Sequence, residues 1–464
     1  MDARQHFCVL LAHLQAQVAG EEGFTLAYSA EQSGFVRFNR GRVRQAGQVQ
    51  QSYVTLALYQ GQRHAESRLA LDGTLVEDLP RLQQTLQQLR AVLPTLSDDP
   101  YLRLNREAWR SELAVEATLP DSAAMAQQIV SAASGLDLVG FLAVGPQYQG
   151  FASSWGAFGW YAASSFNLEF SLFHENGQAV KSAYAGEQWD AQAFARKLED
   201  ARQQLAYLGR PAKALQPGAY RAYLAPAALE ELISLCCWGF GAQALASGGS
   251  PLQRLFSGKA ELSSQVFIEE RIEGGLAPAF TAEGPRQALR LVSQGQPGER
   301  LVSSRSAAEY GLIANGACSG EYPLSLRMHG GELDEQDVLQ RLGSGLYIGN
   351  LWYGNFSDLP AARLTGMTRF ATFWVEDGQI QAPVNTMRFD DSLFDVLGAQ
   401  LEALTREPEL LLPGTAPDEA PVYVHVADGE FTAAETMLMS PGQWLVGLHL
   451  HGHTVVVTCG GRVL

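Results

Sequence analysis

The pattern of apolar and polar residues predicts a helix and then a set of strands in the first part of the chain. Residues Phe7–Val18 place apolar side chains at helical spacing. Four segments with strand-like spacing follow, separated by turns that contain glycine: Phe24–Ala30, Phe35–Asn39, Val43–Gln48 and Tyr53–Tyr59. This order predicts an antiparallel meander after the first helix.

Helical and strand patterns alternate again up to residue 208. Leu79–Leu93 and Ser122–Ala133 have helical spacing, and Leu138–Tyr184 is a set of aromatic-rich strands. Within it, Asn176-Gly177 predicts a hairpin turn, since both residues tolerate positive φ. Ala191–Leu208 reads as an amphipathic helix. We therefore expect an N-terminal α/β domain in which helices cover one face of an antiparallel sheet.

Proline and glycine mark a boundary in the middle of the chain. Gly209-Arg210-Pro211 and Gln216-Pro217-Gly218 follow the last helix of the first part and are typical of a linker. The sequence predicts two domains, residues 1–209 and 220–464.

The second part opens with a strand and a well-delimited helix. Tyr220–Leu224 predicts the strand, and Ala227–Ala246 predicts one helix that begins after Pro226 and ends before Gly248-Gly249. Strands and glycine-rich loops dominate afterwards. The predicted fold class is α+β, with a C-terminal domain rich in β-strands.

Four further elements complete the expected second part. A short helix fits Asp334–Leu342, and Leu346–Leu351 has the pattern of a buried strand. Asp377-Gly378 predicts a type I′ turn between two strands. A final helix, Ser392–Leu404, would carry four leucines on one face.

Composition and charge narrow the possible functions. The chain has 464 residues, of which 46% are hydrophobic and 18% charged, and its net charge is −16. Such a field repels nucleic-acid phosphates and anionic lipids, so we expect no nucleic-acid partner and no membrane partner. The uncharged runs Leu138–Leu168 and Leu232–Gln253 are interrupted by polar residues, glycine and proline. The five cysteines include no CxxC pair and Met1–His6 lacks a basic leader region, so we expect a cytoplasmic protein.

Two segments in the second part together resemble a known family. Gly345-Leu346-Tyr347-Ile348 is followed about twenty residues later by Gly366–Val384, which ends in Val-Glu-Asp-Gly-Gln-Ile-Gln-Ala-Pro-Val. Their order and spacing resemble those of the TldD/PmbA family of bacterial and archaeal metalloproteases, long described as modulators of DNA gyrase. The resemblance covers about residues 1–430 and leaves the tail, 430–464, unmatched.

The resemblance implies a C-terminal domain that holds the active site. One branch, TldD, carries zinc on a helix with an HExxxH motif, and the PmbA or TldE branch lacks that motif and serves as its partner. Here the corresponding position includes Ile233, Ser234, Trp238 and Gly239, and no histidine is present. The neighbouring Cys236 and Cys237 point about 100° apart on a helix and do not converge on one ion. We expect a PmbA/TldE-like chain without catalytic residues or a cofactor of its own, with zinc on a TldD-type partner.

Two other groups of residues offer alternative chemistry. His449, His451 and His453 alternate along a predicted strand, so the three imidazoles could share a face and bind a metal. Cys318 lies in Gly316-Ala317-Cys318-Ser319-Gly320, which matches the outline of a hydrolase nucleophile elbow. The corresponding structural alternatives are a solvated strand face and a glycine-rich turn.

The segment after the predicted strand Leu346–Leu351 is a candidate binding wall. Asn350, Trp352, Tyr353 and Asn355 combine amide groups with two aromatic rings, which suits the wall of a peptide-accepting chamber, although an ordinary turn is the alternative. The resulting hypothesis is a non-catalytic subunit of a TldD/TldE-type peptidase that pairs with a zinc-bearing subunit or with itself. A self-contained hydrolase and a non-proteolytic gyrase regulator stay open as alternatives.

Overall fold

The computed structural model describes residues 2–18, 20–115, 117, 119–272 and 276–412, together with the backbone of five later strands. Its first part is built on one long sheet with the strand order β3-β2-β1-β5-β6-β4. The seventh strand, β7, pairs with the C-terminal half of β6. All neighbours are antiparallel except β4 and β6. The strands are β1 (Gly23–Asn39), β2 (Arg42–Gln60), β3 (Arg63–Ala70), β4 (Arg110–Val115), β5 (Asp137–Ser153), β6 (Phe158–Phe173) and β7 (Ala179–Gly186).

The four short strands expected before residue 60 are two long ones, so that prediction is wrong. Only Arg40-Gly41 forms a turn, with φ of 53° and 64°. The other glycines lie inside strands, where a neighbouring side chain crosses them. A Cβ at Gly47 would lie 2.7 Å from the ring of Phe35, and one at Gly34 would lie 2.5 Å from the hydroxyl of Ser122. Close packing, and not a turn, accounts for these glycines.

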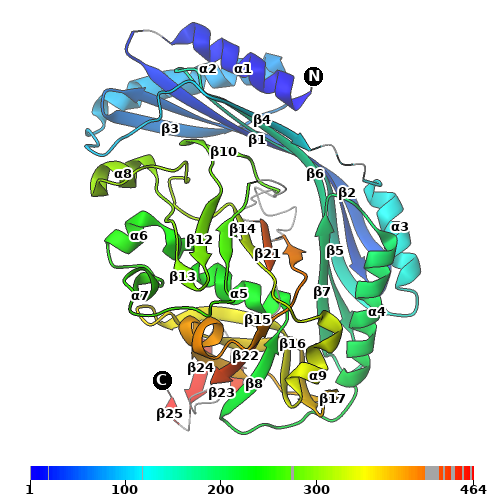
Figure 1. Ribbon diagram of the computed structural model, residues 1–464. Coiled ribbons are helices and arrows are strands. Elements are labelled where there is room, and N and C mark those ends of the chain that lie inside the picture. The colour runs from blue at the N-terminus through cyan, green and yellow to red at the C-terminus, as the bar shows by residue number, and fades with distance from the viewer. Residues whose placement is uncertain are drawn as a thin grey trace.

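Four helices cover the outer face of this sheet in two pairs (Figure 1). The pair α1 and α2 packs over one end, where Phe7 and Leu82 meet Leu56 and Trp160. The pair α3 and α4 packs over the other end, and aspartates cap α1, α3 and α4 at their N-termini. Their bounds are α1 (Ala3–Gln17), α2 (Leu75–Val92), α3 (Ser122–Ala132) and α4 (Ala191–Leu208).

The described C-terminal part contains two mixed sheets, the short hairpin β10–β11 and a three-stranded antiparallel sheet with the order β23-β24-β25. The first sheet has the order β17-β16-β15-β8-β22-β19 with β18 beside β16, and the second has the order β13-β12-β9-β14-β21-β20. The turn between β16 and β17 has φ of 51° at Asp377 and 71° at Gly378, which confirms the predicted hairpin turn. The strands are β8 (Ala219–Leu224), β9 (Ile268–Glu270), β10 (Phe280–Thr281), β11 (Gly284–Pro285), β12 (Leu289–Ser293), β13 (Gln296–Pro297), β14 (Ser325–Met328), β15 (Gly345–Asp358), β16 (Arg363–Glu376), β17 (Gln379–Pro383), β18 (Arg388–Ser392), β19 (Ala403–Leu404), β20 (Glu409–Leu411), β21 (Asp428–Phe431), β22 (Ala434–Met439), β23 (Leu445–His451), β24 (Thr454–Cys459) and β25 (Arg462–Val463).

Two predicted helices of this part are shorter than expected. The helix predicted for Ala227–Ala246 is interrupted at Gly241, where the backbone turns extended and the next amide bonds to Leu301. The helix predicted for Ser392–Leu404 shrinks to η4, because Gly398 leaves the helical region with φ of −111° and ψ of −110°. The helical segments are α5 (Pro226–Cys236), η2 (Cys237–Phe240), α6 (Ala242–Ala246), α7 (Gln253–Phe256), α8 (Ser304–Tyr310), η3 (Glu335–Asp337), α9 (Val338–Leu342) and η4 (Asp395–Ala399).

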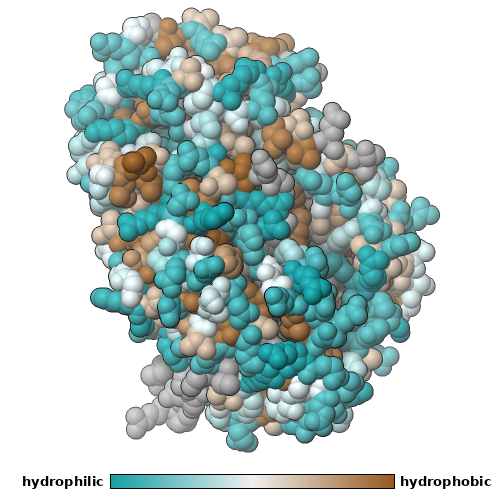
Figure 2. Space-filling model, viewed as in Figure 1, coloured by the Kyte–Doolittle hydropathy of each residue, from teal (hydrophilic) through white to brown (hydrophobic). Residues whose placement is uncertain are grey.

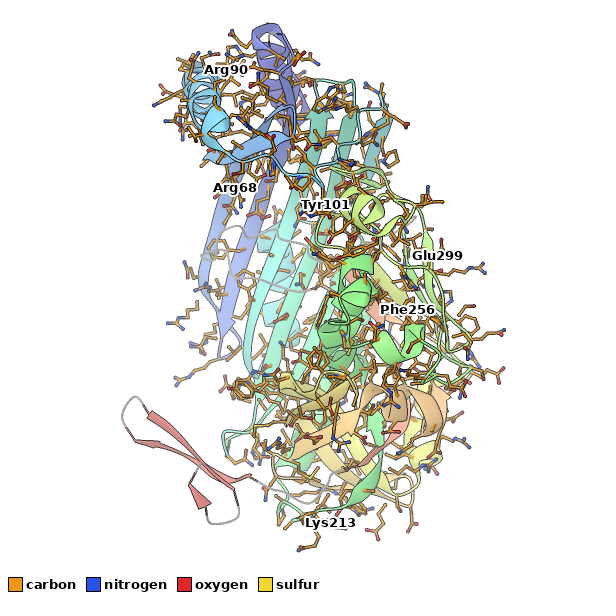
Figure 3. The ribbon with its side chains drawn as sticks, turned by 90° about the vertical axis from the view of Figure 1, so that its left-hand side faces the viewer. Arg68, Arg90, Tyr101, Lys213, Phe256 and Glu299 are labelled. Atoms are coloured by element: carbon orange, nitrogen blue, oxygen red, sulfur yellow. The ribbon has the colours of Figure 1, made fainter. Side chains whose placement is uncertain are left out.

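The long sheet curves around the C-terminal part (Figure 1). Phe373 of β16 belongs to the same hydrophobic core as Phe166 of β6 and Phe194 of α4. In the turned view, Lys213 of the segment between the two parts lies at the opposite end of the molecule from Arg90 of α2 (Figure 3). The combination of helices with mainly antiparallel sheets confirms the predicted α+β fold class.

The described residues contain no candidate for a membrane-spanning helix. None of the helices in the described part of the chain is both long and apolar enough to cross a membrane. On the face drawn in Figure 2, hydrophilic residues dominate and apolar residues occur in small groups.

Candidate functional site

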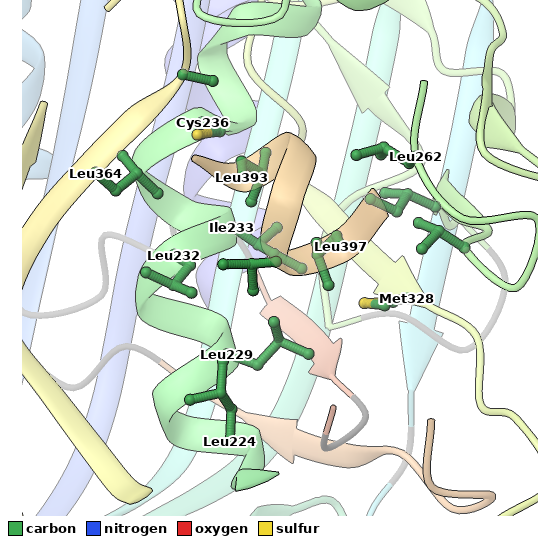
Figure 4. Packing of buried hydrophobic residues seen from close by; sticks show 14 of the residues in the cluster. Leu224, Leu229, Leu232, Ile233, Cys236, Leu262, Met328, Leu364, Leu393 and Leu397 are labelled. Carbon is green, nitrogen blue, oxygen red and sulfur yellow. The ribbon is translucent and has the colours of Figure 1, made fainter. Parts of the chain in front are cut away.

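Helix α5 is a core helix along most of its length. Leu229, Leu232, Ile233 and Cys236 point into the largest hydrophobic cluster, where they meet η4 and β14 (Figure 4). Their spacing of three and four residues gives α5 one continuous apolar stripe. The segment that corresponds to the HExxxH motif of the TldD branch therefore begins, at Ile233, on the buried face of α5.

The four positions of the expected motif do not form a common site. Ile233 is 3% exposed within the core, whereas Ser234 and Trp238 are exposed. Gly239 is buried, and a Cβ there would lie 2.9 Å from Pro251. A histidine side chain at Gly239 would thus need its neighbours to move.

The two thiols of this segment are poor zinc ligands. Burial raises the pKa of Cys236 to about 12 and that of Cys237 to about 11. Zinc binds thiolates, so burial disfavours the form of both groups that a metal would need. Within the described residues, no group of three or more His, Cys, Asp or Glu side chains is arranged to hold a metal ion. The residues present here do not fit zinc.

A large cavity lies beside α5, between the two parts of the molecule. Its volume is about 530 Å³, and its walls come from α4 and β7 on one side and from α5, β15, β16 and β20 on the other. Six acidic and three basic side chains line it: Glu169, Asp200, Glu230, Glu231, Glu335, Glu409, Lys181, Lys197 and Arg369.

The acidic side chains give the cavity an excess of negative charge. Lys197 pairs with Glu409 at 2.5 Å, and Lys181 pairs with Glu169 at 3.1 Å. Desolvation raises the pKa of Glu230, although its carboxylate accepts a hydrogen bond from Ser234. The two lysines are therefore neutralised locally while other carboxylates face the same space.

Two β-bulges shape the wall that β15 and β16 contribute. Asn350 pairs with Arg369 and Ile348 pairs with Thr372, so β16 holds one extra residue between them. The second bulge lies in β15, where two residues oppose Gly366. Phe370 has φ of 56° and Tyr353 has φ of 60°, which is the left-handed region that bulky residues rarely adopt. Bulges of this kind redirect side chains and are common beside functional sites.

The bulges bring a cation and three aromatic rings together. The guanidinium carbon of Arg369 lies 4.2 Å from the ring centre of Trp352 and 5.0 Å from that of Phe370. The rings of Trp352 and Tyr353 lie 5.5 Å apart, and Tyr353 is 73% exposed. Arg369, Trp352 and Phe370 all line the cavity. We call these four residues the Arg369 cluster.

Two of the four predicted wall residues line this cavity. Asn350 and Trp352 do so, whereas Tyr353 and Asn355 are not among its lining residues. Asn350 Oδ1 is buried and accepts no hydrogen bond from the described residues, and Asn355 Oδ1 accepts one from the amide of Phe356. The four residues belong to one strand, β15, rather than to a loop.

Sequence reasoning missed Arg369 and Phe370. In the structure, the buried positions of β16 fall on Leu364, Gly366 and Thr368 and then shift to Ala371, Phe373 and Val375. A change of phase in a period-two pattern indicates a bulge.

The two alternative sites are Cys318 and the histidines near the C-terminus. Cys318 lies in a loop between α8 and β14, and its carbonyl accepts a hydrogen bond from the amide of Glu321. A nucleophile elbow needs a strand before the nucleophile and a helix after it, and this loop has neither. His449 and His451 lie on β23, whose backbone alone is described, and His453 lies outside the described residues.

Comparison with known proteins agrees with this fold. The family model of the PmbA/TldA metallopeptidase C-terminal domain matches residues 217–431. The metalloprotease PmbA of Escherichia coli O157:H7 is 30% identical over 143 residues, which is 30% of this chain and 31% of that protein. The match therefore spans less than a third of this relative.

Solved structures extend the likeness to nearly the whole chain. TldE from Thermococcus kodakarensis superposes with a TM-score of 0.75 at 14% identity, over 93% of this chain and 99% of that one. A proposed modulator of DNA gyrase from Thermotoga maritima superposes with a TM-score of 0.70 at 13% identity, over 94% and 99%. Residues 217–431 therefore match the C-terminal domain of the PmbA/TldA metallopeptidases, and the chain as a whole has the fold of TldE and of the Thermotoga maritima protein.

Proposed function

We propose that this chain is a non-catalytic, TldE-like subunit of a cytoplasmic two-subunit metallopeptidase. In this proposal a TldD-type partner holds zinc and cleaves the peptide. The present chain contributes a peptide-accepting cavity between two domains, residues 1–209 and 220–464.

One observation carries the proposal: the helix that corresponds to the zinc-bearing helix of the TldD branch is packed as core, while the cavity beside it is open and charged. Ile233 is buried, a side chain at Gly239 would need its neighbours to move, and burial raises the pKa of the Cys236 thiol. Three ligands and an open position for water are the minimum for catalytic zinc. A chamber without its own metal is the arrangement expected of a partner subunit.

The experiment compares the chain alone with the chain co-expressed with a relative that carries HExxxH. We expect no stoichiometric zinc in the purified chain and no cleavage of a casein-derived peptide mixture. We expect a complex in size-exclusion chromatography, and cleavage that needs both chains.

A matched control separates assembly from catalysis. Replacing the HExxxH glutamate of the partner by glutamine should abolish cleavage, and the two subunits should still form the complex. One zinc per chain together with cleavage by this chain alone would refute the proposal, and would favour the self-contained hydrolase.

A further inference from the structure

We infer that the Arg369 cluster is a carboxylate-binding subsite of the cavity. Its ligand would be a peptide carboxylate, either the C-terminal group or the side chain of an aspartate or glutamate. This inference rests on the proposed function, because it assumes that peptides enter the cavity.

The first argument is the geometry of the guanidinium. Trp352 and Phe370 lie against it at 4.2 Å and 5.0 Å, and cation–π contacts of this kind hold a guanidinium in place. Its N–H groups point outward in the plane of the guanidinium, where a carboxylate can accept two parallel hydrogen bonds. In the described part of the chain, no carboxylate lies within ion-pair distance of Arg369, in contrast to Lys181 and Lys197.

The second argument is the backbone that presents the arginine. Arg369 directly precedes the left-handed Phe370 of one bulge, and Trp352 directly precedes the left-handed Tyr353 of the other. A regular ladder would need neither conformation. Both departures from regular structure converge on one guanidinium at the cavity wall.

The surrounding charge restricts which carboxylate can bind. Glu230 and Glu231 line the same cavity, and acidic lining residues outnumber basic ones by six to three. These groups repel a ligand with several negative charges and attract ammonium groups. The fitting ligand is a peptide with one carboxylate near Arg369 and neutral or basic residues elsewhere.

Three fluorescein-labelled hexapeptides of otherwise equal sequence, with two internal lysines, test this on the full chain by fluorescence anisotropy. The first has a free C-terminal carboxylate, the second a C-terminal amide, and the third a C-terminal amide and one internal glutamate. Binding of the first but not the second identifies the C-terminus as the source. Binding of the third identifies a side chain.

Matched variants link the carboxylate to Arg369. Arg369→Met should weaken binding of the peptide whose carboxylate is bound, the first or the third, at least tenfold. It should leave binding of the second peptide, which has no carboxylate, unchanged. Arg369→Lys should retain part of the affinity because it keeps the charge. Arg42→Met, at an exposed position of the β1–β2 hairpin, is the control and should bind as the unmodified chain does. Thermal unfolding of each variant checks that it is folded.

The inference is overturned if neither the first nor the third peptide binds more tightly than the second, which has no carboxylate. It is also overturned if the Arg369→Met chain keeps a preference for a peptide with a carboxylate. These readouts use binding by this chain alone. Reconstituted cleavage with a TldD-type partner can therefore succeed while the carboxylate preference fails, and the reverse outcome is equally distinguishable.

Discussion

At the scale of single residues, the most informative buried group outside the cavity is Glu31 of β1. It is 1% exposed, and its carboxylate accepts hydrogen bonds from Gln51 at 2.7 Å and Ser33 at 3.2 Å. Desolvation nevertheless raises its pKa above the usual value. The folded chain thus disfavours the charged form of this side chain.

We predict that Glu31→Gln stabilises the protein more at pH 8 than at pH 5. A raised folded-state pKa means that the stability from the neutral carboxyl is fully present below the unfolded pKa, about 4.3, and is lost as the pH rises through the folded value. Glutamine does not ionise, so the variant keeps its stability. Thermal unfolding at both pH values measures the difference, and exposed Glu66→Gln should show none.

Leu232 of α5 provides a second prediction for a single residue. It is 1% exposed in the largest core cluster, so Leu232→Ala should lower the free energy of unfolding by about 3 kcal/mol through lost burial and a cavity. Leu235, half-buried on the same helix, should lose less on the same substitution. Urea unfolding compares the two. Equal losses would contradict the assignment of α5 as a core helix.

At the scale of elements, the bulges of β15 and β16 hold aromatic residues in a strained backbone. A left-handed conformation costs a residue with a Cβ about 1 kcal/mol, and glycine avoids that cost. We predict that Tyr353→Gly is about 1 kcal/mol more stable than Tyr353→Ala, because Tyr353 is 73% exposed and both changes remove the same ring. Chemical denaturation of the two variants measures this. An alanine variant as stable as the glycine variant would show that the bulge relaxes.

The elements that the sequence predicted well are those whose signals are local. Helix α4 begins where Asp190 caps it, and the turn at Asp377-Gly378 needs only two residues with positive φ. Gly34 misled the prediction, because the hydroxyl that excludes a side chain there comes from Ser122 of α3, about 90 residues further along the chain. Likewise the Arg369 cluster depends on pairing between β15 and β16, so Trp352 was singled out while Arg369 was not.

At the scale of the whole molecule, the two parts share a core. Ala371 and Phe373 belong to the same hydrophobic cluster as Phe166 and Phe194. We predict that a specific protease site inserted after Pro217 yields two fragments that stay together after cleavage. Size-exclusion chromatography under native conditions should show them eluting as one species. Separation into two folded fragments would contradict the shared core and favour independent domains.

The shared core has a consequence for how the chain is made. On a ribosome, β6 and α4 leave the exit tunnel long before β16, which follows Leu208 by about 155 residues (363 − 208 = 155). Until then the ring of Phe166 and its neighbours lack Ala371 and Phe373 as packing partners. Nascent chains with such uncovered apolar surface are prone to aggregate and are natural clients of chaperones. Ribosomes stalled before residue 363 should therefore carry more bound chaperone than ribosomes stalled after residue 412.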